Sequence, residues 1–93
     1  MNKSELINSL SEETTYSKKD VARVLDAFTR IVERSLKSGD KVSLTGFGSF
    51  WVSRRPARKG INPSTKERIN LPEVNIPRFK AGKNLRKIVR GIR

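Results

Sequence analysis

The side chains that could do chemistry in this sequence are almost all cationic. Lysine and arginine together number 21 against nine aspartates and glutamates, which gives a formal net charge of +12. The chain contains no cysteine and no histidine, so it lacks thiolate nucleophiles, disulfides, the most common general base and the most common metal ligand. We therefore expect no enzymatic activity, no metal and no cofactor.

The cations are distributed unevenly along the 93 residues. Residues 1–40 contain seven basic and seven acidic side chains, whereas residues 41–93 contain 14 basic side chains and only Glu67 and Glu73 as acids. A positive field concentrated in one half indicates a polyanionic partner. Nucleic acid is the first choice on charge alone, an anionic membrane surface is the second, and a solvated basic face without a partner is the third.

The sequence gives no sign of export or of a membrane span. No stretch of 18 consecutive residues is apolar, so no membrane-spanning helix is expected. The segment 1–5 is not followed by the apolar core of a signal peptide. Together with the absence of cysteine, these features lead us to expect a cytoplasmic protein.

Two helices are expected to form the first half of the chain. Asn2 and Ser17 each precede an acidic residue by three positions, as in a capping box. The first box predicts a helix over residues 3–13. The second opens a longer helix whose apolar residues recur at i, i+3, i+4 and i+7 and which ends at Gly39. Seven apolar residues on this helix are more than one small subunit can cover, which indicates a dimer.

The pattern changes to alternation after residue 40, which predicts strands. Residues 42–44 and 49–53 are expected to form two strands around a glycine-rich turn. Phe47, Phe50 and Val52 are expected in the core, and Trp51 on the side of the sheet opposite Phe50 and Val52. Farther along, Phe79 is also expected in the core.

A basic β-hairpin is expected over residues 54–76, which contain little to bury, with its tip at Pro63. Alternating apolar residues on the return strand favour this hairpin over the alternative, a disordered basic loop. The alternation changes phase by one residue beside Pro72, which predicts a bulge or kink. Pro56 removes a backbone donor and is expected to bend or fray the outgoing strand.

A last, short helix is expected over residues 83–91. Its apolar residues are Leu85, Ile88, Val89 and Ile92, which recur at helical spacing. Lysines and arginines occupy much of its other face.

The most specific feature is a set of residues at fixed intervals. The densest stretch is Gly46-Phe47-Gly48-Ser49-Phe50, followed by Arg55, Arg58, Gly60, Asn62-Pro63 and Thr65. A second group is Pro77, Phe79, Gly82-Lys83 and Leu85. In these residues, and over its whole length, the sequence resembles the HU and integration host factor family of bacterial DNA-bending proteins, and it is most similar to HU.

This resemblance implies an α+β fold and an intertwined dimer. Two N-terminal helices would precede a three-stranded antiparallel sheet with a long projecting hairpin, the arm, and a short C-terminal helix. The chain would then be a single DNA-binding domain, 1–93. Its parts would be a helical dimerisation base, 1–40, a β-saddle with its arm, 41–82, whose tip lies near 60–66, and the helix, 83–93.

The resemblance further implies double-stranded DNA as the partner, reached through the minor groove by one arm from each subunit, with Pro63 intercalating. Arm contacts are expected from Arg54, Arg55, Arg58, Lys59, Asn62, Pro63, Lys66 and Arg68. Saddle or flank contacts are expected from Lys3, Arg78, Lys80, Lys83, Arg86 and Lys87, each of which has solvated surface as its alternative. A homodimer in the nucleoid is expected, a heterodimer with a paralogue being the alternative, and no small-molecule substrate.

Three questions stay open at this point. Binding without sequence preference competes with the sequence-selective binding of an integration-host-factor-like subunit, because DNA deformability also gives selectivity. A small basic RNA-binding or ribosomal protein has the same size and charge, although no RNA-binding module is recognisable. Ile61 stands where many relatives carry a basic residue, which either removes a phosphate contact or adds an apolar one.

Overall fold

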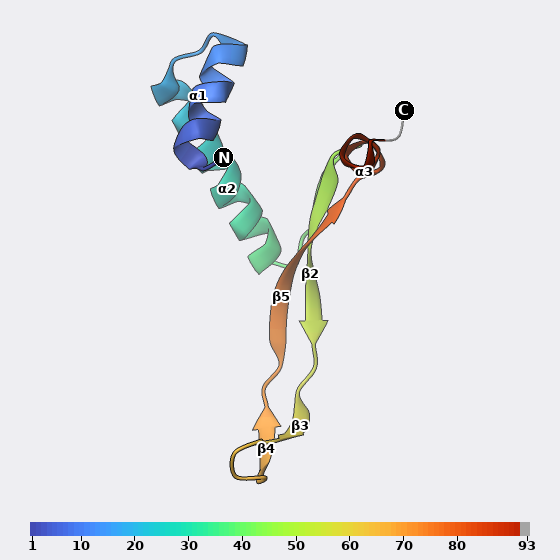
Figure 1. The fold of residues 1–93 in the computed structure, drawn as a ribbon. Coiled ribbons are helices and arrows are strands. Elements are labelled where there is room, and N and C mark those ends of the chain that lie inside the picture. Colours follow the sequence, from blue (N-terminus) through green and yellow to red (C-terminus); the bar gives the residue numbers. More distant parts are fainter. Residues whose placement is uncertain (92–93) are drawn as a thin grey trace. The chain divides into compact units, whose positions relative to one another are not determined.

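The computed structural model describes residues 1–91 (Figure 1). The elements, in chain order, are α1 (Lys3–Thr14), α2 (Lys18–Lys37), β1 (Val42–Leu44), β2 (Gly48–Arg55), β3 (Arg58–Ile61), β4 (Arg68–Leu71), β5 (Val74–Ala81) and α3 (Lys83–Arg90). The α+β class is confirmed, as are the two N-terminal helices and the C-terminal helix. The chain forms two compact units, Met1–Arg34 and Ser35–Arg93, and the predicted single domain stays a prediction.

Both N-terminal helices begin at the predicted caps. The Glu5 amide donates to Asn2 Oδ1 over 2.8 Å, and the Asp20 amide donates to Ser17 Oγ over 3.1 Å. Each bond satisfies one of the backbone donors that a helix leaves unpaired in its first turn. Local sequence therefore sets where these two helices begin.

Helix α2 ends where the glycine predicted it. Gly39 has a φ of +87°, its amide donates to Leu36 O over 3.0 Å, and the Asp40 amide donates to Ser35 O over 2.8 Å. This pair of bonds is a Schellman motif, which needs a left-handed residue that glycine supplies without strain.

The first unit leaves most of its apolar surface uncovered. Val21 is the only apolar side chain of the described residues that is buried, at 7% exposure, whereas Val24 is 70% exposed. A mostly apolar pocket of about 390 Å³ opens between the two helices, lined by Leu10, Thr14, Tyr16, Asp20, Val21, Val24, Leu25 and Phe28. One chain does not cover the apolar stripe of α2, as the count of its apolar residues predicted.

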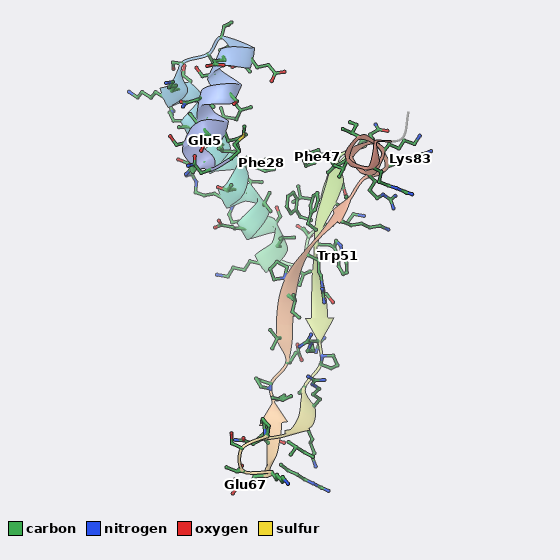
Figure 2. The ribbon with its side chains drawn as sticks, in the orientation of Figure 1. Glu5, Phe28, Phe47, Trp51, Glu67 and Lys83 are labelled. Carbon is green, nitrogen blue, oxygen red and sulfur yellow. The ribbon has the colours of Figure 1, made fainter. Side chains whose placement is uncertain are left out.

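The second unit is built on a three-stranded antiparallel sheet in the order β1-β2-β5. Phe50 pairs with Phe79 across β2 and β5, and their rings lie 4.9 Å apart between centroids. Trp51 pairs with Arg78 and therefore points to the other face. In Figure 2 the labelled Trp51 and Phe47 project from different sides of the strands. The prediction that Trp51 lies opposite Phe50 is confirmed.

The phenylalanine core is only partly covered. Phe47 lies 6.0 Å from Phe79 between ring centroids, but the two side chains are 50% and 45% exposed. The expectation that Phe47 and Phe79 are core residues is therefore not met within one chain. Gly48 is buried below this cluster, because a Cβ there would strike the Phe79 ring and lie 2.8 Å from Lys80 O.

The glycine-rich turn fastens α3 to the sheet. The Phe47 amide donates to Leu44 O over 3.0 Å, and Gly46 between them has a φ of +83°, a value that favours glycine. The carbonyls of this turn then accept from the chain entering α3: Gly82 N donates to Phe47 O, and Leu85 N to Gly46 O.

The predicted basic hairpin is present, with a two-residue gap in each strand. Strands β3 and β4 form a separate two-stranded sheet below β2 and β5 (Figure 1). Arg55 pairs with Val74 before the gap, and Arg58 pairs with Leu71 after it. Each strand thus leaves two residues unpaired at the gap, and the register is the same on both sides of it. The bulge offered as one explanation of the phase change is wrong, because a bulge would shift the register.

The gap itself follows from the prolines. Pro56 and Pro72 each occupy one of its two strands, and proline has no amide to donate to a ladder. The outgoing strand is interrupted at Pro56, in agreement with the fraying predicted there.

Helix α3 ends at Arg90, one residue before the predicted end, and Gly91 caps it with a φ of +73°. The rest of the predicted segment 83–93, with Ile92, lies outside the described residues. Within residues 1–91, no helix combines the length and the apolar character needed to cross a membrane.

Candidate nucleic-acid interface

The tip of the arm is a closed loop that presents Pro63. Asn62 Oδ1 accepts from the Ser64 amide over 2.9 Å, which makes an Asx turn around the proline. The Asn62 amide donates to Glu67 O over 2.8 Å, and the Lys66 amide donates to Asn62 O over 2.6 Å. Pro63 is exposed at this tip, whose end the label of Glu67 marks in Figure 2. The turn therefore holds an apolar ring at the far end of the arm.

The predicted arm cations are divided between two faces of the β3–β4 ladder. Lys59 and Arg68 share one face with Ile61, because Ile61 pairs with Arg68 and Lys59 lies two residues earlier. Arg58 lies on the other face, opposite Leu71. All five side chains except that of Leu71 are exposed, so both faces of the arm offer cations to solvent.

Arg54 already has an anionic partner. Its Nη2 lies 2.6 Å from Glu73 Oε2, and the two side chains are 70% and 44% exposed. This contact raises the pKa of the Arg54 guanidinium above its usual value. Arg55, one residue on, points to the opposite face, where Val74 is its cross-strand neighbour. Of this predicted pair of contacts, Arg54 is therefore already paired with a carboxylate.

The predicted saddle cations of the second unit come from β5 and from α3. Arg78 and Lys80 alternate along β5 on the side of Trp51. Lys83, labelled in Figure 2, opens α3, and Arg86 and Lys87 follow on that helix.

One cation of this face escaped the sequence analysis. Lys41 lines the same pocket as Lys80 and Arg86. The sequence pattern could have predicted this position. Lys41 lies two residues before Ser43 at the start of the alternation, so both fall on the polar side of the strand.

Lys3 belongs to the first unit, unlike the other predicted contacts. Its Nζ lies 2.7 Å from Asp26 Oδ1. The hydrogen bond and the charge of Lys3 lower the pKa of the Asp26 carboxyl below its ordinary value of 3.8.

Comparison with known proteins shows which family this chain is similar to. A family described as "Bacterial DNA-binding protein" matches residues 1–90. The chain is 47% identical over 91 residues to DNA-binding protein HU 1 of Bacillus subtilis, covering 98% of this chain and 99% of that protein. It is 49% identical over 86 residues to DNA-binding protein HU of Clostridium pasteurianum, covering 92% and 94%.

Solved structures give the same result. An Anabaena HU–DNA cocrystal structure matches with a TM-score of 0.86 and 43% identity over 96% of this chain and 97% of that one. HU from Thermotoga maritima matches with a TM-score of 0.70 and 32% identity over 96% and 98%. Proteins of this family are architectural DNA-binding proteins that function as dimers, and they are not enzymes. This chain, with its basic hairpin and proline tip, belongs to the HU family of bacterial DNA-binding proteins.

Proposed function

We propose that this protein organises the bacterial nucleoid in the cytoplasm as a homodimer that binds duplex DNA with little sequence preference and bends it. Each arm enters the minor groove, and Pro63 inserts between base pairs. Minor-groove architectural proteins, HU among them, insert apolar wedges between base steps and bend DNA at a cost of a few kcal/mol per unstacked step. The observation that carries the proposal is the loop that holds Pro63 exposed at the end of a cationic ladder.

The cations supply affinity in this mechanism, and the proline supplies shape. Arginine and lysine side chains on phosphates release counterions, so binding weakens as salt rises. If about half of the six basic arm residues of each subunit contact phosphates, about six charges are neutralised per dimer. The slope of log K against log salt is then about −5 from the arms alone, and saddle contacts make it steeper.

The test compares Pro63→Ala with Arg58→Ala on the same duplex. Pro63→Ala leaves every charge in place, so we expect less bending by fluorescence transfer and a weaker preference for pre-kinked DNA, with the salt slope nearly unchanged. Arg58→Ala removes one cation per subunit, so we expect lower affinity on all duplexes and a slope flatter by up to about two units per dimer.

The opposite pattern contradicts the proposal. If Pro63→Ala bends DNA as sharply as the parent and Arg58→Ala leaves the salt slope unchanged, the tip is only a turn and the arms do not deform DNA. Competition of one labelled duplex against random-sequence DNA tests the lack of preference: a large excess of affinity for one sequence would support a selective subunit instead.

A further inference from the structure

One apolar side chain of the arm stands apart from the others. Strands β3 and β4 carry three large apolar residues, Ile61, Ile69 and Leu71. Ile69 and Leu71 lie on one face of the ladder, over Gly60, where an added Cβ would be 3.0 Å from Leu71 Cδ1 and 3.9 Å from Ile69 Cγ1. Ile61 projects from the other face, on which neither strand carries a second large apolar side chain.

The surroundings of Ile61 are polar and cationic. Lys59 lies two residues earlier on the same face, and Arg68 is the direct cross-strand partner of Ile61. The isoleucine is 66% exposed, compared with 39% for Ile69. A single exposed isoleucine needs no explanation on most surfaces, but this one lies among cations, two residues from Pro63. Its side chain is therefore available to a ligand of the arm tip.

Its distance from Pro63 keeps Ile61 close to any base step at which the proline inserts. Two residues of chain span at most about 7 Å, and successive base pairs of duplex DNA are about 3.4 Å apart. When Pro63 inserts at one step, Ile61 thus lies within about two base pairs of it. An arm in the minor groove therefore brings an apolar side chain to the base edges beside the kink.

The minor groove offers such a side chain one chemical difference between base pairs. Both kinds of base pair present acceptors there, and only G·C adds a donor, the 2-amino group of guanine. Isoleucine has no atom that accepts a hydrogen bond. Contact with G·C thus buries an N–H without a partner, which lowers affinity at least about fivefold. Contact with A·T buries no donor.

We propose that Ile61 makes the arm prefer A·T to G·C at the base pairs that flank the step where Pro63 inserts. What it recognises is the absence of the guanine 2-amino group. The preference concerns only the base pairs beside each kink, so the selectivity of the whole site stays low. The inference rests on the proposed function for the entry of the arms into the minor groove.

Single base-pair exchanges test the preference on the unmodified dimer. The probe is a duplex with one nick, which holds the dimer in place because DNA kinks most easily there. At successive positions one A·T pair is replaced by G·C or by inosine·cytosine, which is G·C without the 2-amino group. Within about two base pairs of a kink, we expect G·C to weaken binding at least about fivefold and inosine·cytosine to bind as A·T does. Equal affinity for G·C and inosine·cytosine at every position would overturn the proposal.

Two matched variants separate the side chain from the deformability of the DNA. A base-pair exchange also changes how easily DNA deforms, but that effect does not depend on residue 61. Ile61→Ala removes the contact, so we expect it to bind G·C and inosine·cytosine alike. Ile69→Ala, on the other face of the ladder, should discriminate as the parent does. Discrimination that persists in Ile61→Ala would assign the preference to DNA deformability and refute the proposal.

Ile61→Lys tests the alternative that isoleucine only removes a phosphate contact. Lysine adds one cation per subunit on a flexible stem. We expect higher affinity for every duplex, a salt slope steeper by up to about two units per dimer, and loss of the discrimination against the 2-amino group. If Ile61→Lys gains affinity and still discriminates as the parent does, residue 61 does not contact the base edges.

The proline and the isoleucine fail separately in this design. Ile61→Ala keeps Pro63 and should bend an A·T-rich duplex as the parent does. If Pro63→Ala also bends it as the parent does, the proposed bending step fails, whereas a loss of discrimination in Ile61→Ala still places residue 61 in the minor groove. If bending depends on Pro63 and the parent discriminates no better than Ile61→Ala, the inference about Ile61 alone is wrong.

Discussion

Asn62 illustrates how one residue of a binding motif also builds the site. Its carboxamide oxygen accepts from the Ser64 amide, so the side chain that could meet DNA also holds the turn around Pro63. A side chain that closes such a turn contributes about 1 kcal/mol through its hydrogen bond. The orientation of the proline ring therefore depends on its neighbour.

Asn62→Ala tests this dependence. Without the acceptor the turn loosens, so we expect weaker bending of duplex DNA, close to that of Pro63→Ala, with an unchanged salt slope because no charge is lost. Asn62→Ser should fall between the parent and Asn62→Ala, since a serine hydroxyl closes the same turn more weakly. Fluorescence transfer across the bound duplex measures the bend, and a parent-like bend in Asn62→Ala would show that the turn holds without it.

The ion pair between Lys3 and Asp26 makes a pH-dependent contribution to stability. Because the pair lowers the pKa of Asp26 below 3.8, the stabilisation is present above that ordinary value and is lost as pH falls through the lowered pKa. Asp26→Asn should therefore lower the melting temperature near neutral pH. The difference from the parent should shrink below about pH 4. Thermal melts from pH 3 to 7 measure it, and a difference independent of pH would assign the effect to something other than this charge.

At the scale of elements, the arm is one hairpin whose register runs through a break. The ladder keeps its pairing on both sides of Pro56 and Pro72, while Arg54 and Glu73 form an ion pair beside the gap. Glu73 thus holds an arginine of the outgoing strand, Arg54, in an ion pair. In the proposed complex, DNA phosphates would compete with that carboxylate for Arg54.

Glu73→Gln should therefore tighten DNA binding by releasing Arg54. We expect higher affinity and a salt slope steeper by up to about two units per dimer, one for each additional phosphate contact. Glu67→Gln is the matched control, because it removes the same charge at the arm tip without releasing Arg54 from its carboxylate. Salt titrations of both variants give the comparison. If the two slopes agree, Arg54 contributes nothing that Glu73 withholds.

At the scale of the whole molecule, the apolar surface exceeds what one chain covers. The stripe of α2 and the rings of Phe47 and Phe79 stay partly exposed. An exposed apolar surface of this kind marks an interface. Proteins of this family function as dimers, and we expect the partner subunit to supply the missing cover.

The dimer should therefore be obligate, with no stable folded monomer. Light scattering at micromolar concentration should give about twice the chain mass of 10.6 kDa. The melting temperature should rise with protein concentration, because association stabilises only the folded state. A cooperative melt that is independent of concentration, at the mass of one chain, would contradict this expectation.

Much of the local structure is determined by the sequence alone. The caps at Asn2 and Ser17, the stop at Gly39 and the hairpin tip at Pro63 all lie where the sequence predicts them. Each depends on backbone donors, backbone angles and side chains only a few residues apart, so the pattern of residue types is enough. The alternation of side chains around Trp51 is equally local, and the face of the sheet on which Trp51 lies was correctly predicted.

The tertiary structure decided the features that join distant residues. The prediction of a bulge at Pro72 was wrong. The phase change in one strand does not show that its partner strand also leaves two residues unpaired, which keeps the register unchanged. The pairs Arg54–Glu73 and Lys3–Asp26 span 19 and 23 residues, and Arg86 reaches the pocket of Lys41 only because the turn at Gly46 fastens α3 to the sheet. Such contacts depend on which strands pair and in what register, which no local pattern of residue types determines.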